Sequence, residues 1–141
     1  MEKLIIQNTF AEAKDLLPHE EVLEDRKSSL MDYIRTSYEE IILPSILICS
    51  KTNVIIDGHH RFFALTEMGI TTIPITKIDY YNPLIITHIE PQLRMEKDQV
   101  IQSSLSKKML PPKSTIHRIV SDTNTTIPLI LLSKLSLVNK Q

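Results

Sequence analysis

The stretch Val54–Leu65 constrains the fold of this chain more than any other part of the sequence. It opens with β-branched residues typical of the end of a buried strand, and the pair Asp57-Gly58 then breaks that strand. After the glycine, apolar residues recur three apart, as on one face of a helix: Phe62, Leu65 and Met68. The stretch therefore predicts a strand, a glycine turn and a helix that begins at His59.

The first turn of this predicted helix is rich in basic groups. His59, His60 and Arg61 follow the glycine directly. The N–H groups at the start of a helix have no acceptor within the helix, and the helix dipole is positive there. These features favour an anion site, with phosphate as the expected ligand. The alternative is an ordinary helix start capped by Asp57, with solvated basic side chains.

Charge and composition narrow the classes of partner. The chain has 16 basic and 17 acidic residues, whereas proteins that grip nucleic-acid backbones carry a basic excess. No apolar run reaches membrane-spanning length, and the N-terminus does not resemble a secretory signal. Cys49 is the single cysteine and lies in an apolar run, so we expect a buried thiol without a disulfide. We therefore expect a cytoplasmic protein without a membrane partner, and the charge balance argues against a nucleic-acid partner.

The rest of the pattern predicts an α+β fold in one domain spanning residues 1–141, with a core over about residues 16–118. Gly69 is expected to end the central helix. Pro74 favours an edge position or a strand start for its segment. The tail, residues 121–141, adds a strand or closes an interface. The expected elements are a helix from Pro18 to about Tyr38, strands over Thr72–Ile78 and Leu84–Ile89, and a helix over Arg94–Leu105.

Three polar clusters interrupt this pattern. They are Leu17–Val22 with its paired glutamates, Asp57–Arg61, and Pro111–Arg118. Taken singly, Glu20 and Glu21 are explained as solvated acids in the first turn of a helix, and the third cluster as an exposed loop. Taken together, the clusters supply a carboxylate base, an anion cradle and a loop with lysine, hydroxyls and imidazole. Phosphoryl transfer uses such parts, usually with a metal ion.

The motifs also carry a resemblance to a known family. Ile-Ile-Asp-Gly-His-His-Arg-Phe-Phe-Ala-Leu, followed by Met-Gly-Ile-x-x-Ile-Pro, resembles the ParB/sulfiredoxin superfamily. The added Pro-His-Glu-Glu and Pro-Pro-Lys-Ser-Thr-x-His clusters are similar to those of the free L-serine kinases. The resemblance implies a ParB/sulfiredoxin-like fold, with a short mixed sheet and two or three packed helices. It also implies transfer of phosphate from ATP or ADP to free L-serine, giving O-phospho-L-serine.

The resemblance assigns a role to each cluster. Glu20 matches the family's catalytic glutamate, and Asp57 matches its second catalytic carboxylate, acting on the hydroxyl or through Mg²⁺. The nucleotide phosphate loop corresponds to Gly58, His59, His60 and Arg61. The amino-acid substrate loop corresponds to Lys113, Ser114, Thr115 and His117.

The chain departs from the family pattern at two points, and these keep other functions open. Ile116 stands where the family has an arginine, and Arg118 is the nearest replacement. The chain also lacks the long segment that separates the second and third clusters in longer kinases. The alternatives are a non-enzymatic ParB-like nucleotide-binding regulator and a DNA-binding module. A sulfiredoxin-like reductase needs a cysteine beside the phosphate loop, where this chain has His59 and His60.

Overall fold

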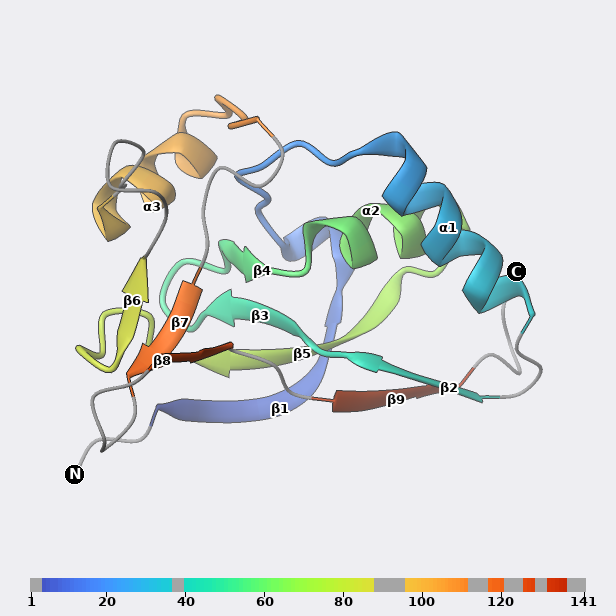
Figure 1. Ribbon diagram of the computed structural model, residues 1–141, viewed down its shortest axis with the longest axis horizontal. Helices are drawn as coiled ribbons and strands as arrows, with labels where there is room; N and C mark the ends of the chain where they lie inside the picture. Colours follow the sequence, from blue (N-terminus) through green and yellow to red (C-terminus); the bar gives the residue numbers. More distant parts are fainter. Residues whose placement is uncertain are drawn as a thin grey trace.

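The centre of the molecule is a mixed four-stranded sheet (Figure 1). The computed structural model describes residues 4–36, 40–87, 96–111, 117–120, 126–128 and 132–136. The strand order is β1 (Ile5–Glu12), β5 (Thr72–Ile78), β3 (Ile46–Cys49) and β4 (Ile55–Asp57). Strand β5 is parallel to β3 and antiparallel to β1, and β4 is antiparallel to β3. The α+β class and the short mixed sheet are confirmed.

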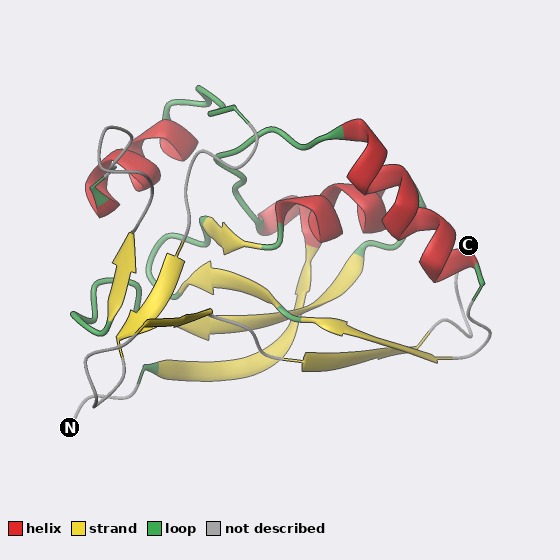
Figure 2. Ribbon diagram, viewed as in Figure 1, coloured by secondary structure: helices red, strands yellow, loops and turns green. Residues whose placement is uncertain are grey.

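Both faces of β3 are buried, which explains its uninterrupted apolar sequence. Ile46 and Ile48 join a core cluster with α1 (Glu24–Arg35) and α2 (His59–Glu67). Leu47 and Cys49 join a second cluster with α3 (Lys97–Leu105). Since successive side chains of a strand point to opposite faces, β3 divides the two clusters. Figure 2 shows α1 and α2 side by side at one end of the sheet and α3 near the other end. The expected burial of Cys49 is confirmed.

The described residues also form two smaller sheets. The two-stranded pair consists of β2 (Glu40–Pro44) and β9 (Leu132–Ser136), and the three-stranded sheet of β6 (Ile85–Thr87), β7 (His117–Val120) and β8 (Thr126–Pro128). The tail therefore adds strands, which is one of the two alternatives expected for it. A 3-10 turn, η1 (Ala13–Asp15), follows β1. The sequence pattern did not indicate the strand β1. None of the described helices has the length and apolar character needed to cross a bilayer.

Two glycines delimit α2, and each has a positive φ that favours glycine. Gly58 is the N-cap with φ 108°, and Gly69 follows the C-cap with φ 82°. Ile70 N–H donates to the Leu65 carbonyl at 2.9 Å, and Gly69 N–H donates to the Thr66 carbonyl at 3.0 Å. This pair of hydrogen bonds is a Schellman motif. The predicted end of the helix at Gly69 is confirmed.

The first predicted helix begins later than expected. Residues 18–23 precede α1, and the acidic residues in its first turn are Glu24 and Asp25. Leu17 instead forms a bridge with Val54, and Glu20 forms a bridge with Leu110. The interpretation of Glu20 and Glu21 as first-turn acids is therefore wrong. Their segment pairs with distant backbone groups, and such pairing overrides local helix signals.

Predictions for three other elements can be compared with the structure. The edge position that Pro74 suggested is wrong because β5 lies between β1 and β3. The strand-start alternative is also wrong, because β5 begins at Thr72 and Pro74 is already paired with Phe10 of β1, although pairing with β3 begins only at Ile75. The predicted helix start at Arg94 is replaced by Lys97, because Glu96 is the N-cap and closes a capping box with Gln99. The end of the predicted strand over Leu84–Ile89 lies outside the described residues beyond Thr87.

Candidate functional site

The turn between β4 and α2 brings a carboxylate and a guanidinium together. Asp57 ends β4, and its Oδ2 accepts a hydrogen bond from Arg61 Nη2 at 3.2 Å. No described side chain caps α2, so the interpretation of Asp57 as an N-cap is wrong. A Cβ on Gly58 would lie 2.9 Å from Arg61 Nη2 and 3.2 Å from Ile46 Cγ1. The turn therefore requires glycine for its backbone conformation, and a side chain there would also have to displace the end of Arg61.

Arg61 is the charged side chain of the first turn of α2. Its side chain is 16% exposed, and Nη2 also donates to the Ser45 carbonyl at 3.3 Å. Its Nε is buried and has no hydrogen-bond acceptor among the residues that the structure describes. The first bond of the helix runs from Phe62 N–H to the Gly58 carbonyl. The preceding N–H groups of this turn therefore have no acceptor within α2.

The two histidines of this turn act as hydrogen-bond acceptors. His59 Nε2 accepts the backbone N–H of His19 at 3.0 Å, and His60 Nε2 accepts the backbone N–H of Leu23 at 3.0 Å. Because a backbone N–H can only donate, neither Nε2 carries a proton. Burial, together with His19 and His117 nearby, holds the pKa of His59 well below its usual value. Nε2 of these two histidines therefore supplies no positive charge, and the assignment of His59 and His60 to the phosphate loop stays a prediction.

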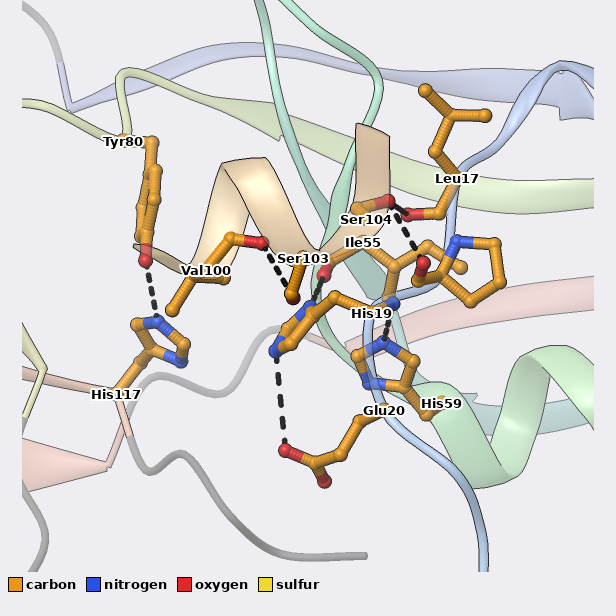
Figure 3. Close-up of polar contacts among 11 residues, drawn as sticks. Leu17, His19, Glu20, Ile55, His59, Tyr80, Val100, Ser103, Ser104 and His117 are labelled. Atoms are coloured by element: carbon orange, nitrogen blue, oxygen red, sulfur yellow. Dashed lines mark hydrogen bonds and ion pairs between the residues drawn. The ribbon is translucent and has the colours of Figure 1, made fainter. Parts of the chain in front are cut away.

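Glu20 lies in a segment that is tied down on both sides. Its residue is 6% exposed. Leu110 N–H donates to the His19 carbonyl at 2.9 Å, and Glu21 N–H donates to the Leu110 carbonyl at 2.7 Å. Ser104 Oγ of α3 donates to the Pro18 carbonyl at 2.8 Å (Figure 3). The backbone of the glutamate that the sequence singled out is thus held between α2 and the residues that follow α3.

His19 lies next to Glu20 and is neutral near pH 7. Its Nδ1 is 2.7 Å from the Ile55 carbonyl, which can only accept, so Nδ1 carries the proton. Its Nε2 then faces Glu20 Oε2 at 3.9 Å, which is longer than a hydrogen bond. Burial lowers the pKa of His19 to about 4. The contact with Glu20 is therefore not an ion pair at neutral pH.

His117, at the start of β7, belongs to the same buried cluster. Its ring centroid lies 6.5 Å from that of His19, and the rings of His19 and His59 lie 4.5 Å apart. Its Nε2 is 2.9 Å from the hydroxyl of Tyr80 (Figure 3). Burial lowers the pKa of His117 to about 3 and raises that of Tyr80, so both groups are uncharged. The sequence indicated Tyr80 only as part of a turn, and its pairing with a histidine 37 residues away has no local signal.

Residues 112–116 of the third cluster and the side chain of residue 118 lie outside the described residues. This applies to Lys113, Ser114, Thr115 and Ile116 and to the side chain of Arg118. The structure therefore brings together Glu20, the Asp57–Arg61 turn and His117, and the substrate loop stays a prediction.

Asp57 suits a magnesium ion that arrives with a nucleotide. Within the described residues, no group of three or more His, Cys, Asp or Glu side chains could hold a metal ion. The Asp57 side chain is 48% exposed at the start of α2. Magnesium is commonly held by one or two carboxylates, with phosphate oxygens and waters as its other ligands. A single accessible carboxylate fits that arrangement.

Comparisons with curated proteins identify relatives of the chain, although no family model matches it. A protein named ATP-dependent L-serine kinase from Staphylothermus marinus is 31% identical over 81 residues, which cover 55% of this chain and 31% of that protein. A protein of the same name from Desulfurococcus mucosus is 31% identical over 100 residues, covering 62% and 39%. A ParB-like protein from Sulfolobus acidocaldarius is 31% identical over 74 residues, covering 52% and 36%. The chain spans about a third of the length of these relatives.

Solved structures agree on the fold. Free serine kinase in complex with AMP aligns with a TM-score of 0.52 at 22% identity, covering 62% of this chain and 36% of that one. A mutant of free serine kinase in complex with ADP aligns with a TM-score of 0.52 at 20% identity, covering 59% and 36%. The chain is related to ParB-like proteins and L-serine kinases, and the resemblance that its motifs indicated is confirmed.

Proposed function

We propose that this chain, a relative of the ParB-like proteins and L-serine kinases, is a phosphotransferase. It moves the terminal phosphate of ATP or ADP to the hydroxyl of a free amino acid, and L-serine is the expected acceptor. Curated relatives named ATP-dependent L-serine kinase support the donor and the acceptor. A reaction between a nucleotide and a free amino acid is expected in the cytoplasm.

One observation carries this proposal: Glu20 is fixed beside the start of α2. The His19 N–H that precedes it is bonded to His59, in the same turn that offers Arg61 and N–H groups without an acceptor inside α2. Phosphoryl transfer depends on positioning a base for the acceptor hydroxyl next to donors that bind the phosphates. The arrangement of Glu20 and this turn meets that requirement.

The proposed step uses Glu20 as the general base. The serine hydroxyl oxygen attacks the terminal phosphorus, and its proton passes to the Glu20 carboxylate. The new O–P bond forms as the bond between that phosphorus and the bridging oxygen breaks, and the nucleotide leaves with one phosphate fewer. The N–H groups of the first turn of α2 and the Arg61 guanidinium bind the negative phosphates. When bound, magnesium neutralises phosphate charge, and Asp57 is the residue suited to hold it.

The acceptor side rests on the third cluster. Lys113, Ser114, Thr115 and His117 are proposed to hold the amino acid. Ile116 cannot pair with a carboxylate, so the serine carboxylate is expected to bind Arg118, Lys113 or backbone N–H groups.

A second candidate is a nucleotide-binding regulator without transferase activity. The relative named ParB-like protein favours it, and so does Ile116, which cannot pair with a substrate carboxylate. The formal net charge of −1 favours neither a DNA-binding module nor any other partner that needs a basic surface.

The decisive experiment incubates the protein with ATP or ADP, magnesium and each standard free amino acid. Phosphorylated products are detected by mass spectrometry, and nucleotide affinity is measured by calorimetry. The test pair is Glu20→Gln and Glu21→Gln, because Glu21 is an exposed neighbour of the same charge. We expect phosphoserine from the wild type and from Glu21→Gln, and a fall of about 10²–10⁴-fold in turnover for Glu20→Gln. Nucleotide binding with no product from any amino acid would favour the regulator instead.

A further inference from the structure

The two histidines that open α2 make contacts that do not depend on a positive charge. Each receives a backbone N–H from the segment that carries Glu20. His19 N–H donates to His59 Nε2, and Leu23 N–H donates to His60 Nε2, both at 3.0 Å. The donors lie one residue before Glu20 and three residues after it. The pair of imidazoles therefore brackets this glutamate on the side of α2.

The opposite side of the segment is held by the chain that follows α3. Leu110 N–H donates to the His19 carbonyl, and its own carbonyl accepts the N–H of Glu21. Both peptide groups of Glu20 are thereby bonded outside their own segment. Proline at position 18 and the extended backbone before α1 leave no helix to hold Glu20 by local bonds. Its position depends on these long-range contacts.

His59 makes the stronger of the two imidazole contacts. Its side chain is buried, whereas the bond to His60 lies at the surface, where water competes for the same N–H. A buried N–H that loses its acceptor costs about 1–3 kcal/mol, so the segment would move rather than keep its place. A displacement of a base by about 1 Å is enough to cost a large part of catalysis.

We infer that His59, assisted by His60, is a positioning residue that sets the place of Glu20 relative to the first turn of α2. The inference rests on the proposed function, because it concerns the distance between the base and the phosphate site. The imidazoles act as neutral acceptors of backbone N–H groups and do not bind phosphate through their side chains. One helical turn thus binds the donor nucleotide through its N–H groups and holds the base through its histidines.

The first test needs no activity. Nitrogen NMR of the full chain measures the protonation state of His59 Nε2, and amide hydrogen exchange is followed at His19 and Leu23. We expect an unprotonated Nε2 and a protected His19 amide in the wild type. In His59→Leu, exchange at His19 rises, whereas His59→Gln retains an acceptor near the place of Nε2 and restores protection. A protonated Nε2, or a His19 amide that exchanges freely in the wild type, would overturn the inference even if His59→Leu does not fold.

The second test separates positioning from stability. We expect His59→Leu to lower kcat by about 10- to 100-fold, with the KM for nucleotide within about twofold of the wild type, and His59→Gln to recover most of the loss. Ala64→Gly is the control, because it weakens the buried middle of α2 and leaves both imidazoles in the chain. An equal fall in kcat in Ala64→Gly would show a general effect of stability and reject the inference.

If exchange at His19 rises while kcat is unchanged, the inference fails and the proposed function survives. A wild type that transfers no phosphate rejects the proposed function and this role with it, while the exchange data still decide whether the contact exists.

Discussion

The backbone N–H of His19 donates a hydrogen bond to Nε2 of His59, 40 residues further along the chain, at 3.0 Å. Together with the bond from Leu23 N–H to His60, this contact ties the segment that carries Glu20 to the first turn of α2. It also determines the chemistry of His59, since an imidazole nitrogen that accepts an N–H is unprotonated. The phosphate site of the proposed reaction must therefore rely on Arg61 and on backbone N–H groups for its positive character.

Gly58→Ala is expected to destabilise the turn and to weaken nucleotide binding. A methyl group there would contact Arg61 Nη2 at 2.9 Å, and φ 108° strains any L side chain. We expect a loss of about 1–3 kcal/mol in the free energy of unfolding, measured by urea denaturation. Gly69→Ala is the matched control, because Gly69 also has a positive φ but lies at the far end of α2. Equal nucleotide affinities in the two folded variants would contradict a phosphate site at this turn.

Arg61→Ala is expected to weaken nucleotide binding by about 1–3 kcal/mol, the range for loss of a charge-assisted hydrogen bond. The reason is that Arg61 is the charged side chain of the first turn of α2 and has a buried Nε–H without a described acceptor. Calorimetry with ADP measures the change. Arg35→Ala serves as the control, because Arg35 pairs with Asp32 at the surface of α1. Unchanged affinity in folded Arg61→Ala would remove this residue from the site.

Asp57→Asn is expected to reduce activity more than stability. Asparagine keeps the shape of the side chain but is a poorer ligand for magnesium than a carboxylate. We expect the variant to need a higher magnesium concentration for half-maximal turnover, and excess chelator to abolish turnover of the wild type. Thermal unfolding provides the control measurement. Full activity of the wild type in excess chelator would show that the reaction needs no divalent ion.

Acid is expected to destabilise the protein through its buried histidines. The folded-state pKa values of His19 and His117 are lowered to about 4 and about 3, whereas an unfolded histidine titrates near its usual 6.5. The unfolded chain therefore binds protons first as the pH falls below 6.5. The stability that the neutral histidines contribute is fully present above that value and is lost between pH 6.5 and the folded pKa, by about 1.4 kcal/mol per pH unit for each group.

Urea unfolding at roughly pH 5, 6 and 7 measures how the free energy of unfolding changes with pH. These values lie above the titration of most carboxylates. His117→Gln removes one of the two groups and should make the slope shallower. NMR titration of the folded wild type gives a check that does not depend on the variant. A ring of His19 or His117 that titrates near pH 6.5 in the folded state would contradict the prediction.

The elements that follow from neighbouring residues were predictable from the sequence. The strand, glycine turn and helix around Gly58 depend on periodicity and on turn chemistry within a dozen residues, and so does the end of α2 at Gly69. The order of the motifs likewise indicated the relationship to ParB-like proteins and L-serine kinases. The start of α1 and the place of β5 in the sheet were not predictable in this way, because pairing with distant strands decides them.

The sequence by itself determined which groups are available at the candidate site: the Glu20 carboxylate, the glycine turn and the paired histidines. Only the tertiary structure decided what those groups do. From the sequence alone, His59 and His60 are expected to be cations beside a helix dipole. In the structure they accept the backbone N–H groups of His19 and Leu23, which belong to a segment about 40 residues away. The physical reason is that the proton state of an imidazole depends on its hydrogen-bond partner and its burial, and neither is encoded in the residues next to it.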